Sequence, residues 1–311
     1  MSEDAGTRIP WTPSNFLALP PDQCELENSR AVLIPVPYDS TASFRSGARE
    51  GPAAMIEASG ALEDYDMELD LDVSQIGIYT APFLEPHLGS PELMVRRVRQ
   101  AVAGYLRSDR IVGVLGGEHS ITAGAVQAHL EQYPELSVLY LDAHADLRDE
   151  YMGTQWGHAS GARRIHAWCP LVLVGVRSIC EEERDYLGAQ ANDPDSQVIS
   201  SFFWPVADED SLKRDVVSRL GDLVYVSVDL DVFDPSVMAA VGTPEPGGMS
   251  WNQVTGLLRA VAESRRIVGF DVCELAPREG PMACTYTAAK LVYKLLAYAS
   301  RPPDSLKHFR E

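Results

Sequence analysis

The motif Asp142-Ala143-His144-Ala145-Asp146 places two carboxylates and an imidazole at alternate positions after an apolar run. That run, residues 137–141, is short and rich in β-branched and aromatic side chains, which predicts a buried strand. Alternate side chains of a strand share one face, so the three polar groups should converge beyond its carboxyl end. Converging carboxylates and imidazoles are typical metal ligands. The motif therefore raises the question of which other residues would complete a metal site.

Other polar groups follow three more predicted strands: His119 after 111–115, Asp229 and Asp231 after 224–226, and Glu274 after 267–272. Taken alone, each has an ordinary structural explanation, such as a helix cap, a turn or a solvated strand end. Gathered at one sheet edge, four Asp and two His would incur a cost of several kcal/mol for each buried unpaired charge. Bound divalent cations remove that cost. The joint pattern therefore favours a metal centre.

The number and type of these ligands favour two ions over one. Four aspartates supply a formal charge of −4, which balances two divalent ions before a bridging hydroxide is added. Oxygen-rich ligand sets with few imidazoles and no thiolate favour Mn²⁺ over Zn²⁺, although Co²⁺ and Ni²⁺ could share them. Two ions about 3.5–4 Å apart can bridge a water and lower its pKa toward neutrality. The predicted chemistry is attack of a metal-bridging hydroxide on carbon or phosphorus.

The elements that position these groups alternate regularly from Arg30 onward. The remaining expected strands are 31–37, 74–79, 170–175 and 198–201, and the expected helices start at Gly51-Pro52 and span 91–107, 120–132, 181–187, 208–220, 251–264 and 284–300. Continuous apolar strands separated by helices predict a three-layer α/β/α fold with a mainly parallel, doubly wound sheet. Ligands of such sheets bind beyond the carboxyl ends of the strands. The polar clusters stand at that edge.

The chain shows no change of composition, low-complexity linker or internal repeat that would divide it. Residues 1–28 are rich in Pro and polar groups, with the isolated aromatic side chains Trp11 and Phe16. We predict that they form an irregular arm on the surface or against a neighbouring subunit. A single domain over residues 29–311 follows.

Composition restricts the class of partner and the compartment. The formal net charge is −19, from 26 basic and 45 acidic side chains, which disfavours nucleic acid and anionic membranes and favours cationic metabolites. The five cysteines are scattered, as expected in a reducing cytoplasm. The first residues lack the features of a signal peptide, and no apolar stretch is long enough for a membrane helix. These observations predict a cytoplasmic protein.

The polar clusters belong to longer motifs, namely Gly116-Gly117-Glu118-His119-Ser120, Asp142-Ala143-His144-Ala145-Asp146 and Ser227-Val228-Asp229-Leu230-Asp231-Val232-Phe233-Asp234-Pro235. The segments 242–248 and 269–277 extend the pattern in the same order. Together they resemble the signatures of the ureohydrolase family, which includes arginases and agmatinases. The resemblance covers nearly the whole chain. It implies the three-layer fold, two Mn²⁺ ions and a homo-oligomer of three or six subunits.

The resemblance also implies roles for individual residues. His119, Asp142, Asp146 and Asp231 would hold one ion or bridge, and His144 and Asp229 would complete the pair. Glu274 matches the family's acidic residue that receives the guanidinium, as a planar carboxylate suits a planar cation. His158 matches a loop histidine that carries a proton to the leaving amine, a task suited to a pKa near neutrality. Asp146, His158 and Glu274 are thus the expected catalytic residues.

The substrate is predicted from the residues beside these motifs. Arginases have an asparagine that helps hold the substrate carboxylate where this chain has Arg148, and the run 146–151 resembles agmatinases instead. A small cationic guanidino compound is therefore expected, with agmatine converted to putrescine and urea, and with arginine, guanidino acids and guanidine as alternatives. Two departures from the family pattern stand out: Glu118 in place of the commoner Asp, and Ala239-Ala240-Val241 in place of a glycine-rich segment, which could reshape the pocket wall.

Two other enzyme classes fit less well. A metallophosphoesterase would need its Asp-x-His near the N-terminus and a later Gly-Asn-His motif, and a related zinc-dependent deacetylase would need a His-His pair; the sequence contains neither arrangement. A non-enzymatic alternative is an inactive paralogue that serves as a regulatory or structural subunit. The presence of all six ligands together with His158 and Glu274 argues against that alternative.

Overall fold

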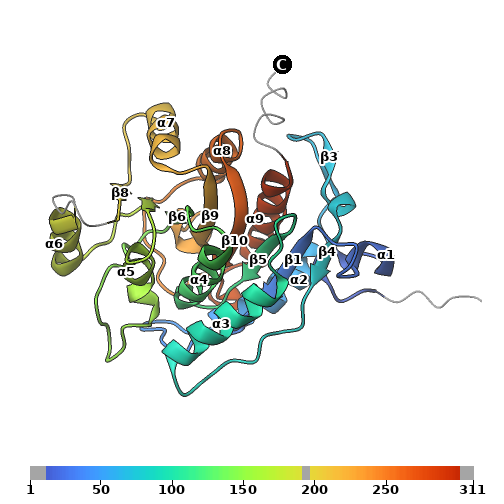
Figure 1. The fold of residues 1–311 in the computed structure, drawn as a ribbon, viewed down its shortest axis with the longest axis horizontal. Helices are drawn as coiled ribbons and strands as arrows, with labels where there is room; N and C mark the ends of the chain where they lie inside the picture. The colour runs from blue at the N-terminus through green and yellow to red at the C-terminus, as the bar shows by residue number, and fades with distance from the viewer. Residues whose placement is uncertain (1–11, 191–196, 302–311) are drawn as a thin grey trace, which may run out of the picture.

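The computed structural model describes residues 12–190 and 197–301, which are built around a parallel sheet of eight strands (Figure 1). The strand order is β4-β1-β5-β10-β9-β6-β7-β8, and every neighbouring pair is parallel. The strands are β1 (Ala31–Pro35), β4 (Ile78–Thr80), β5 (Ile111–Leu115), β6 (Ser137–Leu141), β7 (Leu171–Val174), β8 (Ile199–Phe202), β9 (Leu223–Asp229) and β10 (Arg266–Cys273). The central strands are buried on both faces, which explains their continuous apolar sequences.

Helices cover both faces of this sheet, as Figure 1 shows. One face packs against α2, α7, α8 and α9, and the other against α3, α4 and α5. The helices are α1 (Pro21–Cys24), α2 (Gly51–Ser59), α3 (Pro91–Tyr105), α4 (Thr122–Gln132), α5 (Gly161–His166), α6 (Glu181–Gln190), α7 (Glu209–Arg219), α8 (Trp251–Ala262) and α9 (Met282–Ser300). The predicted three-layer α/β/α fold is confirmed.

Local sequence signals explain where several helices begin. The Ser250 side chain accepts a hydrogen bond from the Gln253 backbone, and the Gln253 side chain accepts one from the Ser250 backbone, which is a capping box at the start of α8. Ser90 caps α3 in a similar way and is followed by Pro91 at the first helical position. The capping residues therefore explain where these two helices begin.

The predicted strand over 74–79 begins too early, because only its end overlaps a strand. Residues Val73–Ile76 form a 3₁₀ helix, η3, because the Asp72 carboxylate accepts a hydrogen bond from the Ser74 backbone and caps the turn. Gly77 then adopts a φ of 68°, and the strand is confined to β4. Helix α5 and the two-stranded hairpin of β2 (Tyr65–Asp66) and β3 (Leu71–Asp72) were not predicted from the sequence.

The described part of the N-terminal segment packs against the β4 edge of the sheet. It contains the 3₁₀ helix η1 (Phe16–Ala18) and α1. The Phe16 side chain is fully buried, and its backbone N–H donates to Thr80 Oγ1 at 2.9 Å. Trp11 lies outside the described residues. The domain boundary at residue 29 stays a prediction.

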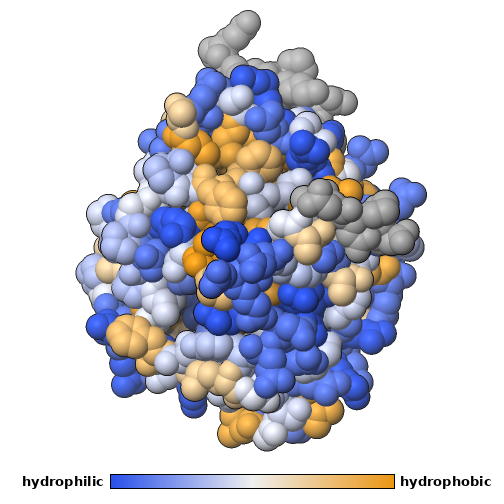
Figure 2. Space-filling model, turned by 90° about the vertical axis from the view of Figure 1, so that its left-hand side faces the viewer, coloured by the Kyte–Doolittle hydropathy of each residue, from blue (hydrophilic) through white to orange (hydrophobic). Residues whose placement is uncertain are grey.

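Within residues 12–190 and 197–301, no helix is long and apolar enough to cross a membrane. Hydrophilic residues predominate on the face shown in Figure 2, where hydrophobic ones gather most densely in the upper half. Such a face agrees with a chain whose formal charge is −19.

Candidate active site

The strand order brings the four polar clusters to one stretch of the sheet. Strands β5, β10, β9 and β6 are consecutive neighbours, and their carboxyl ends lead to His119, Glu274, the pair Asp229 and Asp231, and the Asp142–Asp146 motif. His119 begins the 3₁₀ helix η4 (His119–Ile121) directly after β5, and Asp231 lies in η6 (Leu230–Val232) after β9. The sequence predicted a shared edge but not this order. Strand β10, the last in the chain, inserts between β5 and β9.

Three carboxylates surround one nitrogen of His119. Its Nδ1 lies 3.0 Å from Asp142 Oδ2, 3.3 Å from Asp229 Oδ2 and 3.6 Å from Asp146 Oδ2. These side chains are buried, with exposed fractions of 8% or less. One imidazole nitrogen facing three carboxylate oxygens is a donor set suited to a divalent ion.

A second group lies beside the first and shares Asp142 with it. His144 Nδ1 lies 2.9 Å from Asp231 Oδ2 and 3.5 Å from Asp142 Oδ1. Each oxygen of the Asp142 carboxylate therefore faces a different imidazole. This arrangement corrects the expected grouping, because Asp229 lies with His119 and Asp231 with His144. Residues 229 and 231 separate because the chain turns into η6 after Asp229, whose Oδ1 accepts from the Asp231 backbone at 2.8 Å.

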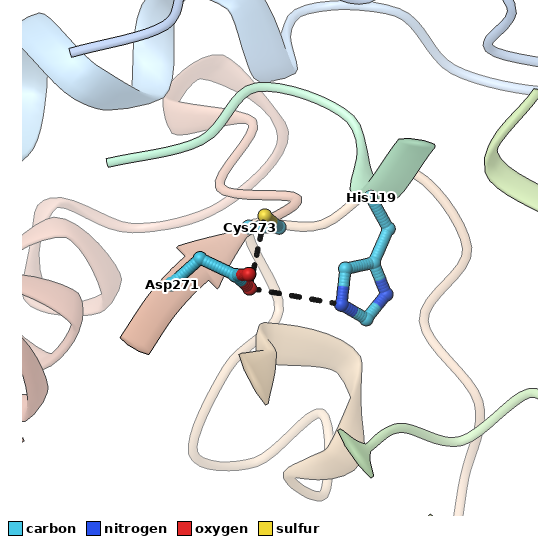
Figure 3. A group of neighbouring side chains, drawn as sticks. All are labelled: His119, Asp271 and Cys273. Atoms are coloured by element: carbon cyan, nitrogen blue, oxygen red, sulfur yellow. Dashed lines mark hydrogen bonds and ion pairs between the residues drawn. The ribbon is translucent and has the colours of Figure 1, made fainter. Parts of the chain in front are cut away.

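The far side of the His119 ring is held by a buried hydrogen-bond network. His119 Nε2 lies 2.8 Å from Ser227 Oγ, which donates to Asp271 Oδ1 at 2.7 Å. Figure 3 shows Asp271 between His119 and Cys273, and Asp271 Oδ2 also accepts from Tyr225 Oη at 2.8 Å. Because Asp271 takes the Ser227 proton, Ser227 must accept from His119 Nε2–H, which leaves the Nδ1 lone pair for a metal.

Sequence reasoning assigned no role to Ser227 or Asp271. The signal for Ser227 was its place two residues before Asp229, on the same face of β9. Asp271 stands two residues before Cys273 in β10, where an acidic residue inside an apolar strand is unusual. These two patterns indicate residues that support the metal ligands.

The pKa values reflect the crowding of like charges in a buried place. Burial, reinforced by Asp146 and Asp231, raises the pKa of Asp142 to about 7. Burial likewise raises the pKa of Asp229 well above its usual range. The pKa of Asp231 falls to about 2, because the neighbouring His144 outweighs the effect of burial. The raised pKa values favour protons on these buried carboxylates. Bound cations would neutralise the same negative charges in place of the protons.

Glu274 and Asp146 adopt strained backbone conformations, with φ values of 69° and 52°. Non-glycine residues seldom occupy this left-handed region, and such strain concentrates at functional sites. The Glu274 backbone N–H donates to Gly117 O at 2.8 Å, and its Oε1 accepts from the His119 backbone at 2.7 Å. Within residues 12–190 and 197–301, Oε2 has no hydrogen-bond partner. Burial, with the nearby Glu118, raises the pKa of Glu274 to about 8.

His158 stands on the loop after the Asp142–Asp146 motif and begins the 3₁₀ helix η5 (His158–Ser160). Its Nδ1 lies 3.2 Å from Thr41 Oγ1, its Nε2 lies 3.2 Å from Ser43 Oγ, and the Tyr151 ring packs edge-on against it. Burial lowers the pKa of His158 and outweighs the opposing effect of Asp146. The imidazole is therefore neutral near pH 7, as a proton acceptor must be.

A pocket of about 320 Å³ joins these groups. All of the predicted site residues except Asp142 line it, namely His119, His144, Asp146, His158, Asp229, Asp231 and Glu274. The other lining residues include Phe44, Arg45, Arg148, Tyr151, Glu183 and Thr243. Arg45 is paired with Glu279 at 2.7 Å, whereas the Arg148 guanidinium lies over the Tyr151 ring. Val241 does not form the pocket wall as anticipated: it is fully buried in the core, and Gly242 and Thr243 line the pocket instead.

Two adjoining groups of carboxylates and imidazoles at the carboxyl edge of a parallel α/β/α sheet define a hydrolase of the two-metal class. The family model described as the arginase family matches residues 29–297. The chain belongs to the arginase family, whose enzymes depend on two metal ions.

Individual relatives agree with this assignment. The chain is 40% identical over 269 residues to the N(1)-aminopropylagmatine ureohydrolase of Thermus thermophilus, covering 86% of this chain and 89% of the relative. It is 34% identical over 303 residues to the enzyme of the same name from Synechocystis, covering 92% and 96%. The solved structure of the agmatine ureohydrolase of Thermoplasma volcanium superimposes with a TM-score of 0.79 at 28% identity, covering 93% of this chain and 95% of that one.

Proposed function

We propose that the chain hydrolyses the guanidino group of agmatine or of its N(1)-aminopropyl derivative, with release of urea and a polyamine. The observation that carries the proposal is the pocket in which the Glu274 carboxylate and both carboxylate–imidazole groups face one space. The curated relatives at 34–40% identity are named for N(1)-aminopropylagmatine, which shares its guanidino end with agmatine. Both compounds also suit an acidic protein.

The six residues His119, Asp142, His144, Asp146, Asp229 and Asp231 would hold two Mn²⁺ ions, and Asp142 belongs to both groups of ligands. Their donor chemistry fits, because both His Nδ1 atoms face carboxylate oxygens within 3.6 Å. Ions bound there would supply an acidified water and neutralise the carboxylates. Co²⁺ or Ni²⁺ would fit the same donors.

The chain's own residues would then orient the substrate and move the proton. Glu274 Oε2 would pair with the guanidinium and turn its carbon toward the metal ligands. Water adds to that carbon, and the bond between this carbon and the nitrogen that carries the alkyl chain breaks. His158 Nε2 would take up the proton that the added water releases and pass it to the departing nitrogen, so that the products are urea and a protonated amine.

The distal end of the substrate distinguishes the candidates. Arg148 lies in the pocket wall with no carboxylate partner within residues 12–190 and 197–301, so it favours a substrate with a carboxylate, such as arginine or 4-guanidinobutyrate. Glu183 in the same wall would instead suit a substrate with a distal amine, although both of its oxygens already accept hydrogen bonds from the backbone of Leu147 and of Cys180. We favour the amines because the named relatives act on them.

The test is urea release by Mn²⁺-loaded protein from agmatine, N(1)-aminopropylagmatine, arginine, 4-guanidinobutyrate and guanidine. We expect the highest kcat/KM with one of the first two. A higher kcat/KM with a guanidino acid would reject the amine proposal, and no turnover of any would support the inactive-paralogue alternative. A cytoplasmic location and a trimer or hexamer belong to the same proposal. Sedimentation velocity tests the subunit number.

A further inference from the structure

Glu118 is fully buried beside the site, yet it faces neither group of predicted metal ligands. Its carboxylate accepts three hydrogen bonds from two residues. Oε2 accepts from the Thr41 backbone at 2.7 Å, and Oε1 accepts from Thr41 Oγ1 and Ser120 Oγ, both at 2.6 Å. Two of the three donors therefore belong to Thr41, which lies in the loop between β1 and α2.

The backbone around Glu118 is shaped for this contact. A side chain at Gly117 would place its Cβ 1.9 Å from the Tyr38 carbonyl oxygen, so only glycine permits the approach. The Glu118 backbone then donates to that oxygen at 2.7 Å. The loop that carries Thr41 is consequently held against the end of β5.

Thr41 in turn contacts His158 through its side-chain hydroxyl. The hydroxyl has one proton, which goes to Glu118 in the short 2.6 Å contact. It accepts from the His158 backbone N–H at 3.1 Å and lies 3.2 Å from His158 Nδ1. When Glu118 is ionised, the only proton of the Thr41 hydroxyl is committed to it, and Thr41 then accepts from Nδ1–H. His158 is thereby set with the proton on Nδ1 and a lone pair on Nε2.

We propose that Glu118, acting through Thr41, is a positioning residue that selects the Nδ1–H tautomer of His158 and keeps Nε2 as its proton acceptor. The inference rests on the proposed role of His158 in proton transfer. With the proton on Nδ1, the exposed Ser43 hydroxyl, 3.2 Å from Nε2, is the donor to that lone pair, and it must turn away before Nε2 takes up a proton. A side chain that touches no reacting atom thus determines which nitrogen of His158 does the chemistry.

The decisive pair of variants is Thr41→Val and Thr41→Ser. Valine keeps the shape but has no hydroxyl, and serine keeps the hydroxyl. Ser120→Ala is the matched control, because it removes a 2.6 Å hydrogen bond to the same Glu118 oxygen without touching His158. Metal content and Tm of each variant show that the fold and the site are intact. Glu118→Asp provides a second route, because it keeps the charge and shortens the reach.

Two measurements read the effect. In protein loaded with diamagnetic Zn²⁺, ¹⁵N-histidine NMR distinguishes protonated from unprotonated ring nitrogens, with His158→Asn assigning the signal. We expect Thr41→Val and Glu118→Asp to weaken the preference for Nδ1–H, and Thr41→Ser and Ser120→Ala to retain it. With Mn²⁺, Thr41→Val should lower kcat about tenfold with little change in KM, and Thr41→Ser should restore most of it.

The double variant Thr41→Val/His158→Asn separates positioning from general structural damage. If Thr41 acts through His158, the double variant is no slower than His158→Asn alone. An unchanged tautomer in Thr41→Val and Glu118→Asp, or additive losses in the double variant, would overturn the inference. If no guanidino compound is hydrolysed, the proposed function fails, and the tautomer measurement by itself still decides this inference.

Discussion

The metal-ligand cluster and the loop wall of the pocket are built in different ways. The cluster uses residues at the ends of β5, β6 and β9, three strands in the middle of the sheet, and its contacts are made among buried side chains. The wall uses the segments around Thr41, His158 and Arg148, which lie in connections between elements. Rigid strands suit charged ligands that must keep fixed positions a few ångströms apart. Loops can differ between proteins with different substrates.

This difference predicts that damage to the cluster abolishes activity while damage to the wall reduces or redirects it. The largest effect should come from Asp142→Ala, because this carboxylate faces both imidazoles. We expect kcat to fall by more than about 10³-fold, with metal content lowered as well. Asp208→Ala, which removes a helix cap that does not line the pocket, is the control and should keep full activity. Full activity in Asp142→Ala would refute the assignment of the cluster.

His158→Asn tests the wall. A proton-transfer residue contributes about 10²- to 10⁴-fold, so we expect kcat to fall by that factor while bound metal stays constant. The measurement is kcat for agmatine alongside metal analysis of the same preparation. Loss of metal in this variant would mean that the wall and the cluster are not separable.

Ser227→Ala examines the support beneath the cluster. Without the hydroxyl, His119 Nε2 loses its 2.8 Å partner and the ring is free to turn. Loss of such outer contacts lowers metal affinity by about 10- to 100-fold. Titration of metal-free protein with Mn²⁺ measures it, and saturating metal should restore most of the activity. An unchanged affinity would show that packing alone orients His119.

The cluster should also give the metal-free protein an unusual pH dependence. Burial raises the pKa of Asp142 to about 7 and of Glu274 to about 8, so the folded chain keeps protons that the unfolded chain has already released. Stability then falls as pH rises from about 4 to 8, and we expect Tm to drop by ~5 °C or more. Bound Mn²⁺ replaces these protons, so the loaded protein should show the opposite slope. Parallel slopes with and without metal would contradict this account.

The smallest effect belongs to Arg148→Ala at the pocket mouth. Removing a half-buried like charge near a cationic substrate is worth ~1 kcal/mol or less, so KM for agmatine should fall about two- to fivefold with kcat unchanged. The same variant should raise KM for 4-guanidinobutyrate. A rise in KM for agmatine would show that Arg148 contacts this substrate favourably.

Much of the fold was predictable because its signals are local. The parallel strands show continuous apolar runs, and the helices begin at recognisable caps such as Ser90 and Ser250. The strand expected over 74–79 was placed too early because one local signal overrode another: the Asp72 cap forms η3 where the apolar pattern indicated a strand. The β2–β3 hairpin is too short to have a periodic signal.

What the sequence by itself determined is the set of groups available at the sheet edge. Asp142, His144 and Asp146 follow one strand at a spacing of two, and strand geometry alone turns such residues to one side. Tertiary structure decided how these groups are combined: Asp229 with His119, Asp231 with His144, and Glu118 with His158 through Thr41. These partners lie far apart in the chain, so their contacts depend on strand order and on loops meeting across the sheet edge, which no local pattern encodes.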